Sequence, residues 1–196
     1  MQKIANIKQL FRTSYGVLTA GALEAQGISR YFIKKMLDNG ELELVKRGVY
    51  KLNEPDVHEL TEVSAIAPRG VLCLYSSALI HELSTFFSGD YHVAIPKKSK
   101  VRLPDYPPIQ LYYWDKHQYG LGIEEIIKDG VPIRMYDAEK TVCDFIKFRH
   151  KTGLDTTKEV LKTYLNSDKR NIDKLVKYSR ELRIRTVIDT YLEILV

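Results

Sequence analysis

Residues 17–52 read VLTAGALEAQGISRYFIKKMLDNGELELVKRGVYKL, and this stretch decides the fold of the N-terminal part of the chain. Two short segments carry apolar residues at helical spacing, Gly27 separates them, and a compact basic hairpin follows. This order of elements is typical of a winged helix-turn-helix, whose second helix enters the major groove of DNA. The stretch therefore predicts a DNA-binding domain over residues 1–53.

Capping residues and apolar stripes define the two predicted helices. Thr19 is placed to cap the first helix, and Gly27 can adopt the left-handed backbone that a tight turn requires. Ser29 is placed to cap the second helix, which would bury Phe32, Ile33, Met36 and Leu37. The exposed residues that we expect to contact DNA are Ser29, Arg30, Tyr31, Lys34 and Lys35.

The hairpin that follows is predicted to form the wing. Residues 42–45 and 49–52 have the composition of two strands, and Gly48 suits the positive φ of a tight connection. Lys46 and Arg47 would lie at the tip, where they could contact the DNA backbone or the minor groove. The alternative is that this charged tip is simply solvated.

The distribution of charge supports a nucleic-acid partner for the N-terminal domain. Residues 1–52 contain nine Lys and Arg against four Asp and Glu, whereas the remaining residues contain 21 of each kind. The whole positive excess of the chain, +5, therefore belongs to this domain. No apolar run approaches the roughly 20 residues that span a bilayer, and residues 1–11 lack the apolar core of a signal peptide. We therefore expect a cytoplasmic protein without membrane contact.

Residues 57–196 are predicted to form a second domain of mixed α/β structure with a helical tail, which makes the fold class α+β. Strand patterns occupy residues 91–95, 109–113 and 131–136, and Pro132 favours an edge position for the last of them. Helical patterns cover residues 60–67 and 76–83, a segment that begins at Asp137, and residues 157–166, 171–182 and 184–195.

Two basic surfaces are predicted in this second domain, and their roles stay open. Lys97, Lys98, Lys100 and Arg102 fall in a proline-rich loop that is either solvated or in contact with an acidic partner or nucleic acid. One helix near the C-terminus carries few acidic residues and would present a basic face. The members of this C-terminal basic face are Lys169, Arg170, Lys174, Lys177 and Arg180.

The sequence gives little support to catalysis, to a metal or to a cofactor. The histidines are scattered without ligand spacing, Cys73 and Cys143 form no CxxC pair, and no phosphate-binding glycine loop is present. Asp137, Glu139 and Asp144, with Lys140, could be imagined as a nuclease cluster, but helix capping explains the first two more simply. We therefore predict no catalytic residues. The aromatic run around Trp114 could stack on bases, with core packing as the alternative.

The sequence resembles the AbiEi family of bacterial antitoxins in three places. Residues 18–52 are similar to the winged helix of that family, with Gly40, Leu42, Val45, Arg47, Gly48 and Tyr50 in the hairpin pattern. The other two places are YSSALIHELST, residues 75–85, and VPIRMYDAEKTVCDFIKF, residues 131–148. The chain has Glu82 where such families often have Gly, and Lys140 where Arg is usual.

The resemblance implies a transcriptional regulator that binds promoter inverted repeats and represses its own operon. It further implies antitoxin activity of type IV against an AbiEii-like nucleotidyltransferase toxin, without a stable toxin–antitoxin complex. Because the sequence contains no heptad pattern, we expect a monomer that assembles on double-stranded DNA. An interaction module that binds a protein or RNA through the C-terminal basic face is the alternative hypothesis.

Overall fold

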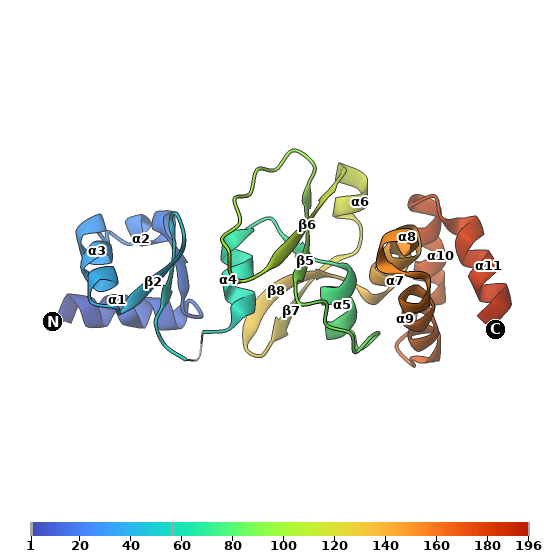
Figure 1. Cartoon of the computed structure of the whole chain (residues 1–196), viewed down its shortest axis with the longest axis horizontal. Helices are drawn as coiled ribbons and strands as arrows, with labels where there is room; N and C mark the ends of the chain where they lie inside the picture. The colour runs from blue at the N-terminus through green and yellow to red at the C-terminus, as the bar shows by residue number, and fades with distance from the viewer. Residues whose placement is uncertain (1, 56, 196) are drawn as a thin grey trace. The chain divides into compact units, whose positions relative to one another are not determined.

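The computed structural model describes residues 2–55 and 57–195, which fold as two compact units (Figure 1). The first unit comprises Met1–Arg69, Lys100–Ile109 and Ile127–Ile133, and the second comprises Gly70–Ser99, Gln110–Ile126 and Arg134–Val196. Helices and strands alternate in both units, which confirms the predicted α+β class. Within the described residues, no helix is both long enough and apolar enough to span a bilayer.

The first unit has the element order of a winged helix-turn-helix, as predicted. The helices are α1 (Gln2–Thr13), α2 (Ala20–Ala25) and α3 (Arg30–Asp38), and the strands are β1 (Val17–Thr19), β2 (Leu42–Lys46) and β3 (Val49–Leu52). The strands form an antiparallel sheet in the order β1-β3-β2. Ile7 and Phe11 of α1 pack with Leu23 of α2 in the core. Ile33 and Met36 of α3 join the same core, so one face of each helix is fixed inward.

A second small core enlarges the first unit beyond the predicted boundary near residue 53. Val17, Val45 and Val49 of the sheet pack against Ile66 of α4 (Glu59–Ile66). Val101 and Ile109, from the later segment of the unit, pack against the same cluster. These apolar side chains leave water only when the later segments join the sheet, so packing groups them with the N-terminal elements.

A five-stranded sheet with the order β6-β5-β4-β8-β7 supplies the strands of the second unit, although Ile109 and residues 127–133, at the ends of β6, β7 and β8, group with the first unit. The strands are β4 (Val71–Leu72), β5 (Tyr91–Pro96), β6 (Ile109–Trp114), β7 (Ile123–Lys128) and β8 (Val131–Tyr136). β4 pairs antiparallel with β5 and parallel with β8. The expectation that Pro132 marks an edge strand is wrong, because β8 lies inside the sheet between β4 and β7, and β7 is the edge strand. Sequence analysis did not identify β7, whose residues IEEIIK lack a clean alternation.

Helix α7 forms the centre of the second unit. The helices are α5 (Leu74–Ile80), α6 (Lys116–Gly120), α7 (Ala138–Lys147), α8 (Arg149–Thr152), α9 (Leu154–Asn166), α10 (Ile172–Glu181) and α11 (Arg185–Leu195). Every residue of α7 from Glu139 to Ile146 is buried, because the helix packs against α5, α9 and α10. Figure 1 shows α7 to α11 gathered at one end of the sheet. This packing buries four charged side chains, Asp137 at the N-cap of α7 and Glu139, Lys140 and Asp144 within it.

The turn after α5 places Glu82 in a left-handed backbone conformation. The Leu83 N–H donates to the Ala78 carbonyl at 2.8 Å and the Glu82 N–H donates to Leu79 at 3.2 Å, the two bonds of a Schellman motif. Glu82 occupies its left-handed position with φ 58°, where a Cβ is unfavourable. Glycine would adopt this backbone without that cost.

We predict that Glu82→Gly stabilises the protein by about 0.5–1 kcal/mol, because relief of the left-handed strain exceeds the entropy of the added glycine. Urea unfolding monitored by circular dichroism measures the change. Glu82→Ala is the matched control, since it removes the exposed carboxylate but keeps the Cβ. Equal stabilisation by alanine would show that charge, rather than backbone strain, is responsible.

Candidate nucleic-acid interface

The turn between α2 and α3 is a Schellman motif centred on Gly27. Thr19 caps α2 as predicted, because its Oγ1 accepts a hydrogen bond from the Ala22 N–H at 3.2 Å. At the other end, the Gly27 N–H donates to Glu24 at 2.9 Å and the Ile28 N–H donates to Leu23 at 3.0 Å. Gly27 has φ 68°. The chain therefore reverses within a few residues and brings α3 across α2.

Helix α3 buries Ile33 and Met36 as predicted, but Phe32 and Leu37, which were also expected in the core, are only partly buried. Ile33 is 3% exposed and Met36 is fully buried, whereas Tyr31 is 67% exposed. The residues expected to contact DNA, Ser29, Arg30, Tyr31, Lys34 and Lys35, are all exposed. They lie on the first two turns and at the N-cap of one helix, so the structure brings them together on a single element.

The N-terminus of α3 keeps its polar groups available. Ser29 has the extended backbone of an N-cap residue, but its hydroxyl accepts no capping hydrogen bond. The first backbone N–H groups of a helix lack partners within the helix and carry a partial positive charge. A serine hydroxyl beside these groups is a favourable environment for a phosphate oxygen.

Arg30 is held by an ion pair that sequence analysis missed. Its guanidinium donates to Glu24 Oε1 from Nε at 3.2 Å and from one terminal nitrogen at 3.1 Å. The Arg30 side chain is nevertheless 88% exposed, so this pair contributes little stability and exchanges readily with another acceptor. The contact links α2 to α3 and directs the guanidinium toward α2.

The two basic residues of the hairpin have different environments. Arg47 is exposed at the turn between β2 and β3, and no ion pair or hydrogen bond of its side chain occurs among the described residues. Lys46 is partly buried, and its ammonium donates to the Ile66 carbonyl at the end of α4 at 2.7 Å. Burial also lowers the pKa of Lys46. The prediction that Lys46 contacts DNA stays untested, but its ammonium is already engaged by the carbonyl at the end of α4.

Other cations of the first unit also stabilise the fold. Lys51 of β3 lies between two carboxylates, 3.4 Å from Glu43 and 3.1 Å from Glu62, and its side chain is only 17% exposed. Lys8 and Arg12 of α1 form ion pairs with Glu41 and Glu54, respectively, each at 2.8 Å. Among the described cations of the helix-turn-helix and its hairpin, Lys34, Lys35 and Arg47 are exposed without such pairs, as are Lys3 of α1 and Lys100 and Arg102 of the later segment.

The predicted C-terminal basic face loses one of its members. Lys169, Arg170, Lys177 and Arg180 are exposed. The Lys174 ammonium, by contrast, lies 3.1 Å from Asp137 and 3.2 Å from Glu139. Although partial burial disfavours its charge, these two carboxylates raise the pKa of Lys174. Lys174 is corrected to a structural cation that neutralises buried acids, and the other four form the remaining C-terminal basic face.

The buried charges of α7 are arranged in pairs. Asp137 caps the helix as predicted, accepting from the Lys140 N–H at 2.8 Å. Glu139 accepts from the Tyr164 hydroxyl at 2.9 Å as well as contacting Lys174. Lys140 and Asp144 form an ion pair with no solvent exposure, and burial raises the pKa of Asp144. A buried pair of this kind is costly to break, which indicates a structural role.

Comparison with known families identifies the N-terminal unit. Residues 6–53 match the family model described as "Transcriptional regulator, AbiEi antitoxin". The AbiEi resemblance is confirmed. The matched residues extend from α1 to the end of β3 and include the whole helix-turn-helix and its wing. No curated protein matches the chain.

We predict that Gly27→Ala destabilises the first unit by about 1 kcal/mol, because an L-residue is strained at φ 68°. A Cβ at Gly27 would meet nothing within 4 Å, so the backbone alone accounts for the cost. Gly21→Ala is the matched control, since Gly21 is equally open but helical, and it should stabilise by up to about 0.5 kcal/mol. Thermal unfolding measures both changes. A loss of the same size in both variants would contradict the assigned turn.

Proposed function

We propose that this protein is a DNA-binding transcriptional autoregulator with antitoxin activity, which acts in the cytoplasm. The observation that carries the proposal is the exposed set Ser29, Arg30, Tyr31, Lys34 and Lys35 on α3, directly after a glycine turn, in a segment that matches AbiEi regulators. A helix presented in this way fits the major groove, with its N-terminal residues against base edges.

Each exposed residue has a distinct proposed role. Arg30 and Tyr31 occupy the first turn of α3 and would read base edges, and a guanidinium suits the two acceptors of guanine. Lys34 is four residues after Arg30 on the same face and would reach a base or a phosphate. Ser29 and the helix N-terminus would hold one phosphate, and Lys35 would contact the backbone beside it.

The hairpin would supply the second contact with DNA. Arg47 lies at its tip with an unengaged guanidinium, which can reach the backbone or the minor groove. The ion pair between Arg30 and Glu24 lowers the binding free energy that Arg30 can contribute, because a DNA acceptor must replace Glu24. We propose that single copies assemble on the two halves of an inverted repeat in the promoter of the protein's own operon.

The proposal for the second unit rests on the AbiEi match of the first. We propose that it counteracts an AbiEii-like nucleotidyltransferase toxin, without forming a stable complex with it. The alternative is a module that binds a partner protein or RNA through Lys169, Arg170, Lys177 and Arg180, whose side chains are exposed. A toxin that co-purifies in stoichiometric amount would favour this alternative.

The first test measures binding to the chain's own promoter at several salt concentrations. If each copy neutralises about three phosphates, log affinity should fall against log salt with a slope of about −2.7 per bound copy. Arg30→Ala should weaken specific binding by about 1–3 kcal/mol and leave binding to random DNA much less affected, because it removes a base contact. A flat salt response would contradict the proposed interface.

Lys46 and Arg47 provide an internal control, because they are adjacent basic residues in different environments. Arg47→Gln should weaken binding to all DNA sequences and reduce the salt slope by about one per bound copy. Lys46→Gln should leave both quantities nearly unchanged, since its ammonium bonds to Ile66. If Lys46→Gln lowers the affinity as much as Arg47→Gln, Lys46 also contacts DNA, and the proposed role of the hairpin is contradicted.

The second test addresses the antitoxin activity. The open reading frame beside the gene is expressed with and without the full chain, and growth is measured. We expect the chain to relieve the toxicity, and an Arg30→Ala, Lys34→Ala double variant to relieve it equally when both genes are expressed from unrelated promoters. Unrelieved toxicity with the intact chain would refute the antitoxin proposal and leave the DNA-binding proposal standing.

A further inference from the structure

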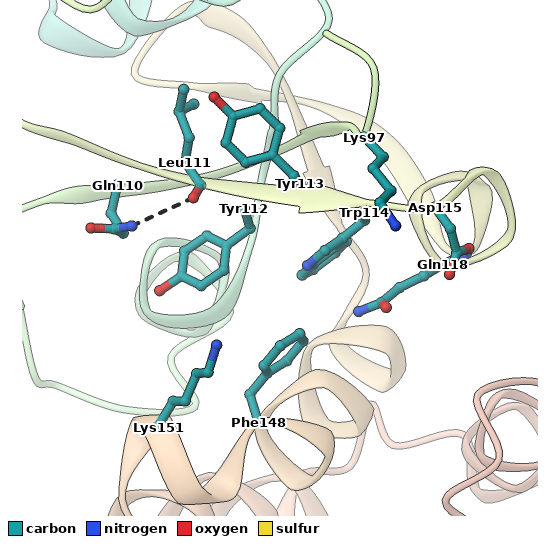
Figure 2. A pocket seen from close by; sticks show the side chains of 10 residues that line it. All are labelled: Lys97, Gln110, Leu111, Tyr112, Tyr113, Trp114, Asp115, Gln118, Phe148 and Lys151. Carbon is teal, nitrogen blue, oxygen red and sulfur yellow. Dashed lines mark hydrogen bonds between the residues drawn. The ribbon is translucent and has the colours of Figure 1, made fainter.

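A cleft of about 440 Å³ opens in the second unit. Figure 2 shows that Tyr112 and Trp114 of β6 point into the cleft, whereas Leu111 and Tyr113 point to the other side of the strand. Phe148, at the end of α7, faces them from the opposite wall. The volume is within the range of about 300–1,000 Å³ that is usual for small-molecule sites.

The walls of the cleft offer flat aromatic surfaces. Tyr112 and Phe148 are half-buried, with ring centroids 6.3 Å apart. Trp114 lies nearly parallel to Phe148, with an angle of 12° between the rings. The Tyr112 ring is held in place, because its hydroxyl bonds to His92 Nδ1 at 2.9 Å and the two rings stack. A planar ligand would therefore meet aromatic faces that are already oriented.

The indole nitrogen of Trp114 is a buried donor without an acceptor. Trp114 is 3% exposed, and its Nε1 has no hydrogen-bond partner among the described residues. Figure 2 shows this nitrogen on the side of the ring that faces Tyr112 and Phe148. Buried donors in proteins are nearly always paired, so an unpaired one in a cleft wall indicates a missing acceptor.

The charged groups of the cleft also favour an acceptor-rich ligand. Lys97 and Lys151 are exposed on its rim, and neither forms an ion pair with a described residue. The one carboxylate of the lining, Asp115, accepts the Gln118 N–H at 2.8 Å as the cap of α6. This bond lowers the pKa of Asp115, so the carboxylate is already engaged. The groups left to bind a ligand include the two ammonium ions and two N–H donors that lack a partner among the described residues, Trp114 Nε1 and Gln118 Nε2.

We propose that this cleft binds a free nucleoside monophosphate. The base would stack on one of the rings of Tyr112 and Phe148, which lie at 67° to each other, and would offer an acceptor to Trp114 Nε1, and the phosphate would contact Lys97 or Lys151. A base supplies the planar ring and the acceptors, and the phosphate supplies the negative charge. No residue of α3 lines the cleft, so the site adds a ligand to the proposed regulator and uses none of the proposed DNA contacts.

The chain itself contains the probe for this site, because Trp114 is its only tryptophan. AMP and UMP are titrated into the full protein, with excitation at the red edge of tryptophan absorption, where bases absorb little. We expect a saturable change in emission. Lys151→Gln and Lys97→Gln are each compared with the wild-type protein, and at least one should weaken binding roughly threefold to tenfold. Lys158→Gln is the matched control, since Lys158 is exposed on α9 and does not line the cleft.

Four results would overturn the proposal. They are the absence of a saturable response to either nucleotide at millimolar concentration, an equal affinity for the uncharged nucleosides, an equal response to inorganic phosphate alone, and an equal loss of affinity in Lys158→Gln. A short single-stranded oligonucleotide forms a further arm, and tighter binding of it than of the mononucleotide would overturn the assignment to a free nucleotide. Promoter binding by the lysine variants should remain unchanged, so failure at the cleft is distinguishable from failure of the DNA-binding proposal.

Discussion

The left-handed turn at Gly27 determines which residues of α3 reach the solvent. Its two hydrogen bonds close α2, and the apolar pair Leu23 and Ile28 enters the core on either side of the turn. Once Ile28 is buried, the helical period requires Ile33 and Met36 to follow it inward. The opposite face of α3, with its arginine and lysines, is then exposed, and Arg30 alone is oriented further, by its ion pair with Glu24. The face of α3 proposed to contact DNA is therefore selected by the backbone turn at Gly27 and by apolar packing.

The charge excess of the first unit has two different physical roles. Lys51 is nearly buried between Glu43 and Glu62, and it ties β3 to α4. Lys46 bonds to the end of the same helix. These contacts fix the wing in place, whereas Lys34 and Arg47 keep their charges in the solvent. Net charge attracts DNA over distance regardless of pairing, but only exposed and unengaged cations release counterions when a phosphate binds. The number of phosphate contacts that we expect is therefore smaller than the number of basic residues in the first unit.

Local interactions explain which parts of the structure could be predicted from the sequence. Thr19, Gly27 and the buried stripe of α3 act on residues a few positions away, so their patterns in the sequence are sufficient. The internal contacts of Lys46 and Lys174 could not be predicted, because their partners, Ile66 and Asp137, are 20 or more residues distant in the sequence. Strand β7 was missed because its pairing with β8 compensates for an irregular pattern. The cleft beside Trp114 combines residues from β6 and α8 and has no signature within either segment.

Two side chains of the second unit, Glu82 and Lys140, satisfy their surroundings incompletely. Glu82 accepts a left-handed backbone that glycine would adopt freely. Lys140 donates to one oxygen of Asp144 and lies 4.2 Å from the centroids of both the Trp114 and the Tyr136 rings, while Asp144 Oδ1 has no hydrogen bond. An arginine at this position would present two parallel donors, which could pair with both carboxylate oxygens of Asp144. In both places this chain retains the architecture with a weaker side chain. The cation beneath Trp114 also holds the indole from one face, which leaves its N–H edge directed toward the cleft.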